Sequence, residues 1–357
     1  MNVALIGLPR SGKTTVFDVL TGLAVPVQSH GVPAAEARGK HIGVIHIEDE
    51  RVDGLSTIFS PKKTTYSEIT LVDAPAVEHG DKGPVIDPEQ LGALKTAEAF
   101  LHVLRAFHNP SVAHSRGTVD PLRDAQLVES ELVSTDYVVA EKRLERMAKE
   151  HFEGPERNVL EKCREHLERE EPLRLLDLAE QDKAHIGGYS FASQKPMVLL
   201  ANVDEDKVRG EPDTQLADYA RSRGMGYTEL SAEVEMEIGE LEPEDAREFL
   251  REMGISEPAR RKFIRVAYET MNLLSFFTVG TNEVRSWPVP AGTTAIQAAG
   301  HVHTDMARGF IRAEVVPCPD FLETGSFAEA RKQHKMHVEW KDYLVQDGDV
   351  IYFRFNV

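Results

Sequence analysis

The stretch best suited to chemistry is the glycine-rich segment at residues 7–14, which reads Gly-Leu-Pro-Arg-Ser-Gly-Lys-Thr. It matches the pattern G-x-x-x-x-G-K-[ST] of a phosphate-binding loop. Its glycines allow a tight turn in which successive backbone N–H groups converge on an anion. Lys13 would then reach the β- and γ-phosphate oxygens of a nucleoside triphosphate, and the Thr14 hydroxyl would hold Mg²⁺.

The segments on either side of this loop have the order that it requires. An apolar run of strand length occupies residues 2–6, and residues 15–20 carry apolar side chains at helical spacing before Gly22. The sequence therefore predicts strand, loop and helix, rather than a glycine turn before an ordinary helix.

Further strands are expected at residues 42–47, 69–72, 99–104 and 197–201, alternating with helical patterns. Such alternation is typical of a parallel sheet covered by helices on both faces. Asp73 directly follows one of these strands, where a nucleotide-binding fold places a carboxylate on the Mg²⁺ side of the site. The alternative for Asp73 is a helix N-cap or a turn residue.

The composition excludes several classes of protein. The 357 residues carry a formal charge of −18, which excludes a protein that coats nucleic acid by bulk electrostatics. Any RNA contact must be local, and no DNA binding is expected. No apolar stretch approaches about twenty residues and no basic leader precedes the first strand, so we expect a soluble, unprocessed protein without membrane attachment. The use of only two cysteines favours the reducing cytoplasm, and we expect a monomer. Cys163 and Cys318 lack C-x-x-C spacing, which excludes a disulfide framework and a zinc ribbon.

An insertion with helical spacing separates the last two of these strands. Its two segments, at residues 122–149 and 156–171, are divided by Gly154-Pro155 and predict an antiparallel, coiled-coil-like hairpin. The apolar positions expected to pack between the segments are Val128, Leu132, Val139, Leu160, Cys163 and Leu167. Basic residues interleaved with glutamates indicate a solvated face, and the alternative is a docking arm for RNA.

The last part of the chain changes to short β-like runs. They include residues 287–289, 311–316, 337–340 and 350–353, with one small helix expected at 327–333. This pattern predicts a separate α+β domain of roughly eighty residues.

Several motifs together resemble one family, the YchF or Obg-like ATPases of the Obg-related P-loop GTPase group. They are the phosphate loop, the segments at 202–205 and 231–235, and C-terminal segments that look like a TGS domain, such as 298–305, 308–314 and 346–350. The resemblance spans the whole chain and implies an α/β fold with three parts. These are a P-loop NTPase G domain with a parallel-rich sheet (1–121 and 193–275), the inserted helical hairpin (122–192), and a β-grasp TGS domain (276–357).

The resemblance also implies a ligand, a cofactor and a partner. The ligand and substrate would be ATP, hydrolysed slowly, the cofactor Mg²⁺, and the partner the ribosome or ribosomal RNA in a translation or stress-related role. The phosphates would contact Pro9, Arg10, Ser11, Gly12, Lys13, Thr14 and Thr15, with Mg²⁺ held by Thr14 and Asp73. The base would contact Asn202, Val203, Glu205, Ser231, Ala232 and Glu233.

The choice of base depends on two of these residues. In GTP-specific relatives an N-K-x-D motif uses its aspartate to accept two guanine N–H groups. Val203 and Glu205 occupy its lysine and aspartate positions here, and the longer carboxylate crowds the guanine edge. Together with the resemblance, this favours adenine.

Both switch regions and the phosphate loop depart from the family pattern. In the phosphate loop, Arg10 replaces an asparagine that can place a monovalent cation beside the phosphates. In the switch regions, Ala37 replaces a Mg²⁺-binding threonine, and Ala76 replaces a glycine whose N–H binds the γ-phosphate. Val77 cannot orient water as the glutamine of Ras-like enzymes does. The Arg10 guanidinium either acts as an arginine finger in cis, which makes it a catalytic candidate beside Lys13, or points to solvent.

These departures leave several hypotheses. A slow ATPase is weighed against a non-hydrolysing nucleotide-binding adaptor, a GTP-using relative, and a redox regulator that senses through Cys163 and Cys318. For RNA, the candidate contacts are Arg260, Arg261, Lys262, Arg285, Arg308 and Arg312. The alternative for Arg308 and Arg312 is pairing with Asp305 and Glu314 to hold the C-terminal fold.

Overall fold

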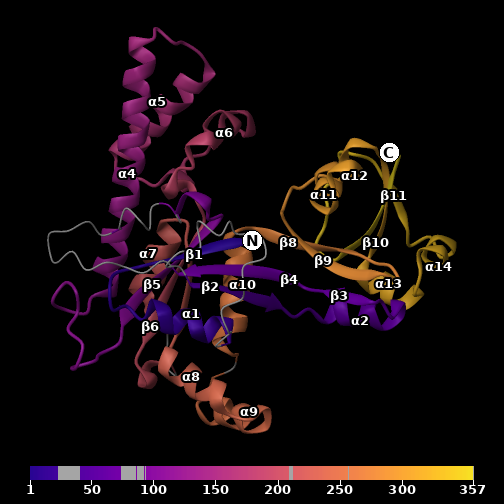
Figure 1. The fold of residues 1–357 in the computed structure, drawn as a ribbon, viewed down its shortest axis with the longest axis horizontal. Helices are drawn as coiled ribbons and strands as arrows, with labels where there is room; N and C mark the ends of the chain where they lie inside the picture. Colours follow the sequence, from indigo (N-terminus) through magenta and orange to yellow (C-terminus); the bar gives the residue numbers. More distant parts are fainter. Residues whose placement is uncertain are drawn as a thin grey trace. The chain divides into compact units, whose positions relative to one another are not determined.

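The computed structural model describes residues 1–22, 41–73, 86, 92, 94–208, 212–255 and 257–356. The chain forms two compact units, one made of Met1–Ile45 with Thr70–Thr270 and the other of His46–Ile69 with Met271–Val357. Each unit contains a six-stranded sheet (Figure 1). Within the described ranges, no helix has both the length and the apolar character needed to cross a membrane.

The sheet of the first unit has the strand order β2-β4-β1-β5-β6-β7. β1 pairs in parallel with β4 and β5, and β6 pairs in parallel with β5 and β7. The predicted α/β fold with a parallel-rich sheet is therefore confirmed. The strands are β1 (Asn2–Ile6), β2 (His41–Ile47), β4 (Ser67–Asp73), β5 (Ala99–Ala106), β6 (Met197–Val203) and β7 (Gly226–Leu230).

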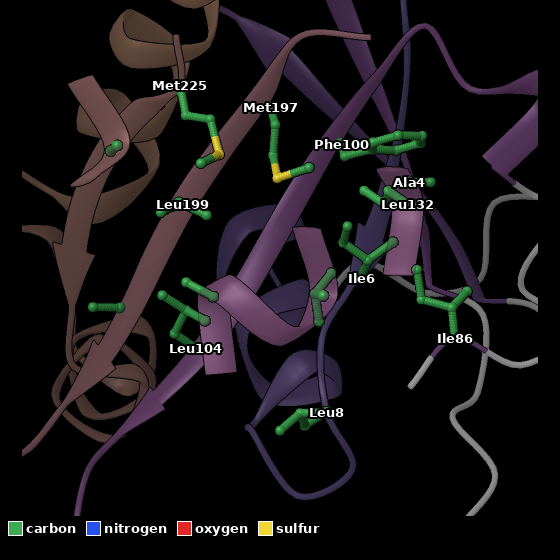
Figure 2. Close-up of a cluster of buried hydrophobic side chains, with 14 of the residues drawn as sticks. Ala4, Ile6, Leu8, Ile86, Phe100, Leu104, Leu132, Met197, Leu199 and Met225 are labelled. Carbon is green, nitrogen blue, oxygen red and sulfur yellow. The ribbon is translucent and has the colours of Figure 1, made fainter. Parts of the chain in front are cut away.

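Helices cover both faces of this sheet. On one face, α4 (Pro121–Lys149) and α7 (Thr214–Ser222) pack over a cluster that includes Ile6, Phe100 and Leu199 (Figure 2). The opposite face contacts α1 (Lys13–Thr21) and α10 (Ala259–Thr270). At Gly226 of β7, for example, a Cβ atom would lie 2.8 Å from a methyl carbon of Val266 in α10. Burial on both faces explains why the strands read as continuous apolar runs.

The helical insertion forms an arm in which α4 packs against α5 (Pro155–Glu168), with α6 (Glu180–Ile186) beside α5 (Figure 1). The predicted hairpin of two helices is present. Its core joins Val133 and Leu144 of α4 to Leu160, Cys163 and Leu167 of α5.

The prediction of which residues of the first helical segment pack inside the arm was wrong. Val128 and Leu132 pack in the core over the sheet, and Val139 is exposed. The reason is that α4 is a single helix of 29 residues. Its first half covers the sheet and its second half forms the arm, so its apolar stripe serves two different cores.

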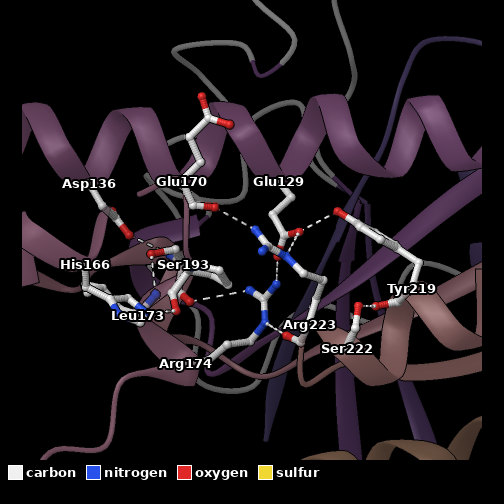
Figure 3. A network of polar contacts seen from close by, with 11 residues as sticks. Glu129, Asp136, His166, Glu170, Leu173, Arg174, Ser193, Tyr219, Ser222 and Arg223 are labelled. Carbon is white, nitrogen blue, oxygen red and sulfur yellow. Dashed lines mark hydrogen bonds and ion pairs between the residues drawn. The ribbon is translucent and has the colours of Figure 1, made fainter. Parts of the chain in front are cut away.

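A buried ion cluster fixes the base of the arm (Figure 3). Glu129 of α4 accepts a hydrogen bond from Arg223 Nε at 2.8 Å and forms an ion pair with Arg174. Arg174 belongs to the short helix η1 (Leu173–Leu175) and also donates from Nε to the carbonyl oxygen of Arg223 at 2.7 Å. The Tyr219 hydroxyl of α7 donates to the same carboxylate. The cluster therefore ties the arm to the end of α7.

The sheet of the second unit has the order β11-β10-β12-β8-β9-β3. β10 is antiparallel to β11 and β12, β8 is antiparallel to β9, and β12 is parallel to β8. The strands are β3 (Lys63–Thr65), β8 (Leu273–Thr278), β9 (Glu283–Pro290), β10 (Phe310–Pro317), β11 (His337–Glu339) and β12 (Asp349–Phe355). The helices are α2 (Glu50–Phe59), α11 (Ala295–Val302), α12 (Thr304–Arg308), α13 (Cys318–Thr324) and α14 (Phe327–Lys332).

The small helix predicted at 327–333 is present as α14, but the expectation of only one helix in the C-terminal domain is wrong. α11, α12 and α13 are present in addition to α14. None of the three exceeds eight residues, and so short a segment does not display a helical period in its apolar residues.

Residues 46–69 belong to the second unit, although the predicted boundaries included them in the G domain. β3 pairs in parallel with β9, and Val52 and Leu55 of α2 are buried in one cluster with Phe277. Arg51 Nη1 also lies 2.7 Å from Asp347 Oδ2. These partners are more than 200 residues apart in sequence, so no local pattern could reveal the association.

Candidate nucleotide-binding site

The phosphate loop connects β1 to α1 and depends on two glycines. Gly7 has φ 143° and Gly12 has φ 87°, a region that favours glycine. A Cβ atom at Gly7 would lie 2.4 Å from the carbonyl oxygen of Val103 in β5. Helix α1 begins at Lys13, so its free N–H groups and its partial positive charge face the loop.

Lys13 folds over this loop. Its Nζ donates hydrogen bonds to the carbonyl oxygens of Gly7 at 2.9 Å and Leu8 at 3.0 Å. Burial lowers the pKa of Lys13 to about 8, although the charge of Asp73 opposes the shift. The ammonium group is therefore held at the loop and poorly solvated, which favours exchange of its carbonyl partners for phosphate oxygens.

We expect the affinity for ATP to fall as the pH rises through about 8. A bound polyphosphate favours the charged ammonium, so binding raises the pKa of Lys13 and takes up a proton above pH 8. From pH 7 to pH 9 the dissociation constant should rise about tenfold. Titration calorimetry checks this. A Lys13→Arg variant, which stays charged, should bind more weakly but show no such trend, and a constant wild-type affinity would contradict the assignment.

Thr14 and Asp73 meet at the ends of α1 and β4. The Thr14 hydroxyl donates to Asp73 Oδ2 at 2.9 Å, as the predicted metal site requires. Asp73 Oδ1 is buried and has no hydrogen-bond partner among the described residues, and the same is true of Ser11 Oγ. A hydroxyl and a carboxylate with an unused oxygen are ligands that Mg²⁺ prefers, since it commonly binds one or two carboxylates, substrate phosphates and water. The residues present therefore fit Mg²⁺.

On the base side, Asn202 connects two segments of the site. This side chain is buried at the end of β6, and its Oδ1 accepts a hydrogen bond from the backbone N–H of Ala232 at 3.0 Å. A Cβ atom at Gly12 would lie 2.5 Å from Asn202 Nδ2, so the amide also lies against the phosphate loop. Ser231 is the N-cap of α8 (Ala232–Glu240). The structure thus brings the predicted phosphate and base segments together.

The remaining predicted base residues differ in their exposure. Val203 is buried and lines cavities of about 520 and 280 Å³. Glu205 is exposed at the start of η4 (Glu205–Lys207), and Glu233 is exposed in the first turn of α8. The two carboxylates are therefore accessible to a ligand, and the valine provides an apolar wall.

The loop that follows β5 also borders the site, although it was not predicted. Arg105, which is almost fully buried, holds this loop by donating to the carbonyl oxygens of Phe107, Asn109 and Val112 at 3.3, 3.3 and 2.8 Å. The backbone N–H of His108 donates to Asp204 Oδ1 at 2.8 Å, next to the base-binding segment. An arginine inside an apolar strand was the signal in the sequence.

The same loop reaches the phosphate side of the site. Arg10, at φ 63°, donates from Nη1 to the carbonyl oxygen of Ala113 at 3.1 Å. The next residue, His114, is buried, and its Nε2 lies 2.9 Å from Asp124 Oδ2 at the start of α4. The loop therefore lies against both ends of the site, and Arg10 is held by a protein partner.

Several predicted features lie outside the described residues. These are the switch positions Ala37, Ala76 and Val77. The proposed thiol sensor is not supported by the structure, because burial raises the pKa of Cys163 and of Cys318 to about 11. Both thiols are fully buried and poorly reactive.

Known proteins resemble this chain over nearly its whole length. The ribosome-binding ATPase YchF of Escherichia coli O157:H7 is 37% identical over 360 residues, which cover 99% of this chain and 98% of the relative. The protein of the same name from Bacillus subtilis (strain 168) is 33% identical over 367 residues, with both chains fully covered. The chain belongs to the YchF family. Within it, residues 273–356 match the family model YchF-GTPase_C, whose description is "Protein of unknown function (DUF933)".

Solved structures support the fold. The structure of the Schizosaccharomyces pombe YchF GTPase matches with a TM-score of 0.82 at 26% identity, covering 99% of this chain and 97% of that chain. A GTP-binding protein from Pyrococcus horikoshii OT3 matches with a TM-score of 0.62 at 19% identity over the full length of both, which shows the fold alone. The predicted family and fold class are both confirmed.

Proposed function

We propose that this chain is a slow ATPase that binds ATP with Mg²⁺ and associates with the ribosome in the cytoplasm as a monomer. The observation that carries the nucleotide part is the convergence of Lys13, Thr14 and Asp73 at the amino end of α1. The ribosomal part is supported by relatives that are named ribosome-binding ATPases and cover the whole chain.

Each residue has a distinct task in this proposal. The backbone N–H groups of residues 9–15 would cradle the phosphates, and Lys13 would neutralise charge that develops on the β- and γ-phosphate oxygens. Mg²⁺ held by Thr14 and Asp73 would supply further positive charge between those phosphates. Asn202 binds the backbone of Ala232 and lies against the phosphate loop, so it would help to position the two segments for the nucleotide.

The base preference provides the first test. Val203 and Glu205 offer no short aspartate for the two guanine N–H groups, so ATP should bind more tightly than GTP by about 1–2 kcal/mol, the scale of a lost charged hydrogen-bond pair. Titration calorimetry with both nucleotides measures the difference, with Glu233→Gln as a control for charge near the base. Equal or reversed affinities would contradict the assignment.

Arg10 provides the second test. We propose that its guanidinium takes the place of the monovalent cation, so hydrolysis should not depend on potassium. Arg10→Asn, which is compatible with φ 63° because asparagine tolerates that region, should lower the rate at least about tenfold in sodium and make it potassium-dependent. Rates at constant ionic strength decide this, with Arg221→Asn on α7 as control. Strong potassium activation of the wild type would refute the role of Arg10.

The candidate RNA contacts are constrained by their pairing in the structure. Arg308 forms an ion pair with Asp305, and Arg312 Nη2 lies 3.5 Å from Glu314 Oε1, as the alternative in the sequence analysis expected. Lys262 donates to the carbonyl oxygen of Glu229 at 3.3 Å. Because the chain as a whole repels phosphate, binding to ribosomal RNA must use local clusters such as these.

A nucleotide-binding adaptor that does not hydrolyse ATP is the second candidate. It is favoured by Ala37, Ala76 and Val77, which replace groups that position Mg²⁺, the γ-phosphate and water. It predicts tight ATP binding without phosphate release.

A further inference from the structure

One buried arginine holds the segment that we call the β5 loop (residues 107–113). Arg105, near the end of β5, has only 2% of its surface exposed. Its Nε donates to the carbonyl oxygen of Phe107 at 3.3 Å, and its Nη2 donates to those of Asn109 at 3.3 Å and Val112 at 2.8 Å. A single guanidinium group therefore fixes the path of the loop at three points.

The charge of this guanidinium is not neutralised by these partners, because backbone carbonyl groups carry no net charge. Burial, together with the nearby charge of Arg10, lowers the pKa of Arg105, yet an arginine side chain remains protonated at neutral pH. Its Nη1 is also buried and has no hydrogen-bond partner among the described residues. A charge that is desolvated in this way destabilises the fold. What the arrangement provides in return is a loop with one defined conformation.

The first residue of the β5 loop lies where the phosphate loop meets the base segment. The Arg105 guanidinium lies 4.7 Å from the centre of the Phe107 ring. A Cβ atom at Gly12 would lie 3.7 Å from Phe107 Cε1 and 2.5 Å from Asn202 Nδ2. The ring that Arg105 holds therefore borders the phosphate loop at the point where Asn202 approaches it.

Two further contacts attach the β5 loop to the site. At its beginning, the backbone N–H of His108 donates to Asp204 Oδ1 at 2.8 Å. At its end, the carbonyl oxygen of Ala113 accepts a hydrogen bond from Arg10 Nη1 at 3.1 Å. Two of the carbonyl groups that Arg105 binds lie between these contacts in the sequence, so the arginine controls how both ends of the loop are presented.

We propose that Arg105 is a positioning residue for the nucleotide, which it serves by keeping Phe107 and the partner of Arg10 in place before ATP binds. Without this arginine the loop would adopt other conformations as well. The apparent dissociation constant would then rise in inverse proportion to the fraction of molecules that are competent to bind. Arginine suits the task because its planar fork can reach several carbonyl groups at once, whereas lysine has a single nitrogen. The inference rests on the proposed function and adds a residue that prepares the site.

Titration calorimetry of the full chain with ATP and Mg²⁺ tests the inference. Arg105→Met keeps the length of the side chain without its donors. It should raise the dissociation constant of ATP about tenfold, which corresponds to a loop that is competent about a tenth of the time. Arg105→Lys should raise it several-fold, because one nitrogen cannot replace both Nε and Nη2. This second variant carries the test if Arg105→Met does not fold.

Arg123→Met is the matched control. Arg123 also donates to a backbone carbonyl oxygen of the segment between β5 and α4, that of Thr118 at 2.8 Å. Thr118 lies beyond the β5 loop, so this variant removes an equivalent bond and charge without releasing residues 107–113. It should bind ATP with the wild-type affinity.

A double-mutant cycle with Phe107→Leu distinguishes positioning from a purely structural role. If Arg105 acts through Phe107, the two substitutions are coupled, and residues in contact do not have additive effects. The double variant should then bind ATP only slightly more weakly than the weaker single variant. Independent effects would multiply instead.

Two results would overturn the inference. One is wild-type affinity for ATP in Arg105→Lys and in a folded Arg105→Met, and the other is multiplication of the two effects in the cycle. Single-turnover hydrolysis by the wild type separates the inference from the proposed function. If the wild type binds but does not hydrolyse ATP, and Arg105→Met weakens binding, the slow ATPase is refuted and the inference stands. If the wild type hydrolyses ATP and the variants bind it equally well, the function stands and the inference fails. A wild type that binds no nucleotide would refute both.

Discussion

A Lys13→Met variant should lose at least about 100-fold of its single-turnover rate of ATP hydrolysis. Methionine keeps the length of the buried side chain but removes the ammonium group that the structure places at the phosphate loop. Phosphoryl transfer depends almost entirely on positioning and electrostatic stabilisation, and removal of one preorganised donor costs about 10²–10³ in rate. Rapid-quench measurements with excess enzyme separate this effect from weaker ATP binding.

The control for this variant is Lys183→Met. Lys183 lies on α6 of the arm, where it pairs with the exposed Glu180, so its loss changes the net charge by the same amount away from the site. The control should hydrolyse ATP at the wild-type rate. If Lys13→Met also kept that rate while both proteins showed wild-type melting temperatures, Lys13 would have no role in the chemistry.

Glu129→Gln should destabilise the first unit by about 3 kcal/mol. The carboxylate is buried between Arg174 and Arg223 (Figure 3), and Arg174 is itself almost fully buried. Burial, together with the neighbouring charge of Arg223, lowers the pKa of Arg174 to about 10. Loss of one partner from a buried ion pair costs about 3–5 kcal/mol, because the remaining charge is left uncompensated. Urea unfolding followed by circular dichroism measures the change.

Glu145→Gln provides the comparison for this variant. Glu145 lies on the same helix but is exposed, so its substitution should change the free energy of unfolding by less than about 0.5 kcal/mol. If the two variants had equal stability, the ion cluster would not hold the arm, and its geometry would be incidental.

The part of the site that could be predicted from the sequence is the part formed by consecutive residues. Residues 7–14 and their flanking strand and helix occupy one stretch, so local spacing determined their structure. Asp73 could be placed because parallel strands end at the same edge of a sheet, which brought it to Thr14. Asn202 was recognised through the family motif, but its contact with Ala232 required the structure.

The features that sequence reasoning missed depend on contacts between distant residues. Residues 46–69 lie in the second unit because β3 pairs with β9. Nothing in the sequence of the β3 segment indicates that it pairs with β9. Arg105 was not recognised as part of the site, although its three carbonyl partners follow within the next seven residues. The core of the arm was mispredicted for a different reason, because the continuous helical pattern of α4 contributes to both the sheet core and the arm.

The most direct measurement is single-turnover hydrolysis of γ-labelled ATP by the wild-type chain, with and without ribosomes. We expect slow phosphate release that requires Mg²⁺, is lower with GTP than with ATP, and falls in Asp73→Asn, because that variant loses a charged ligand for the metal. Tight binding of ATP without phosphate release in either condition would contradict the account and leave the adaptor as the function.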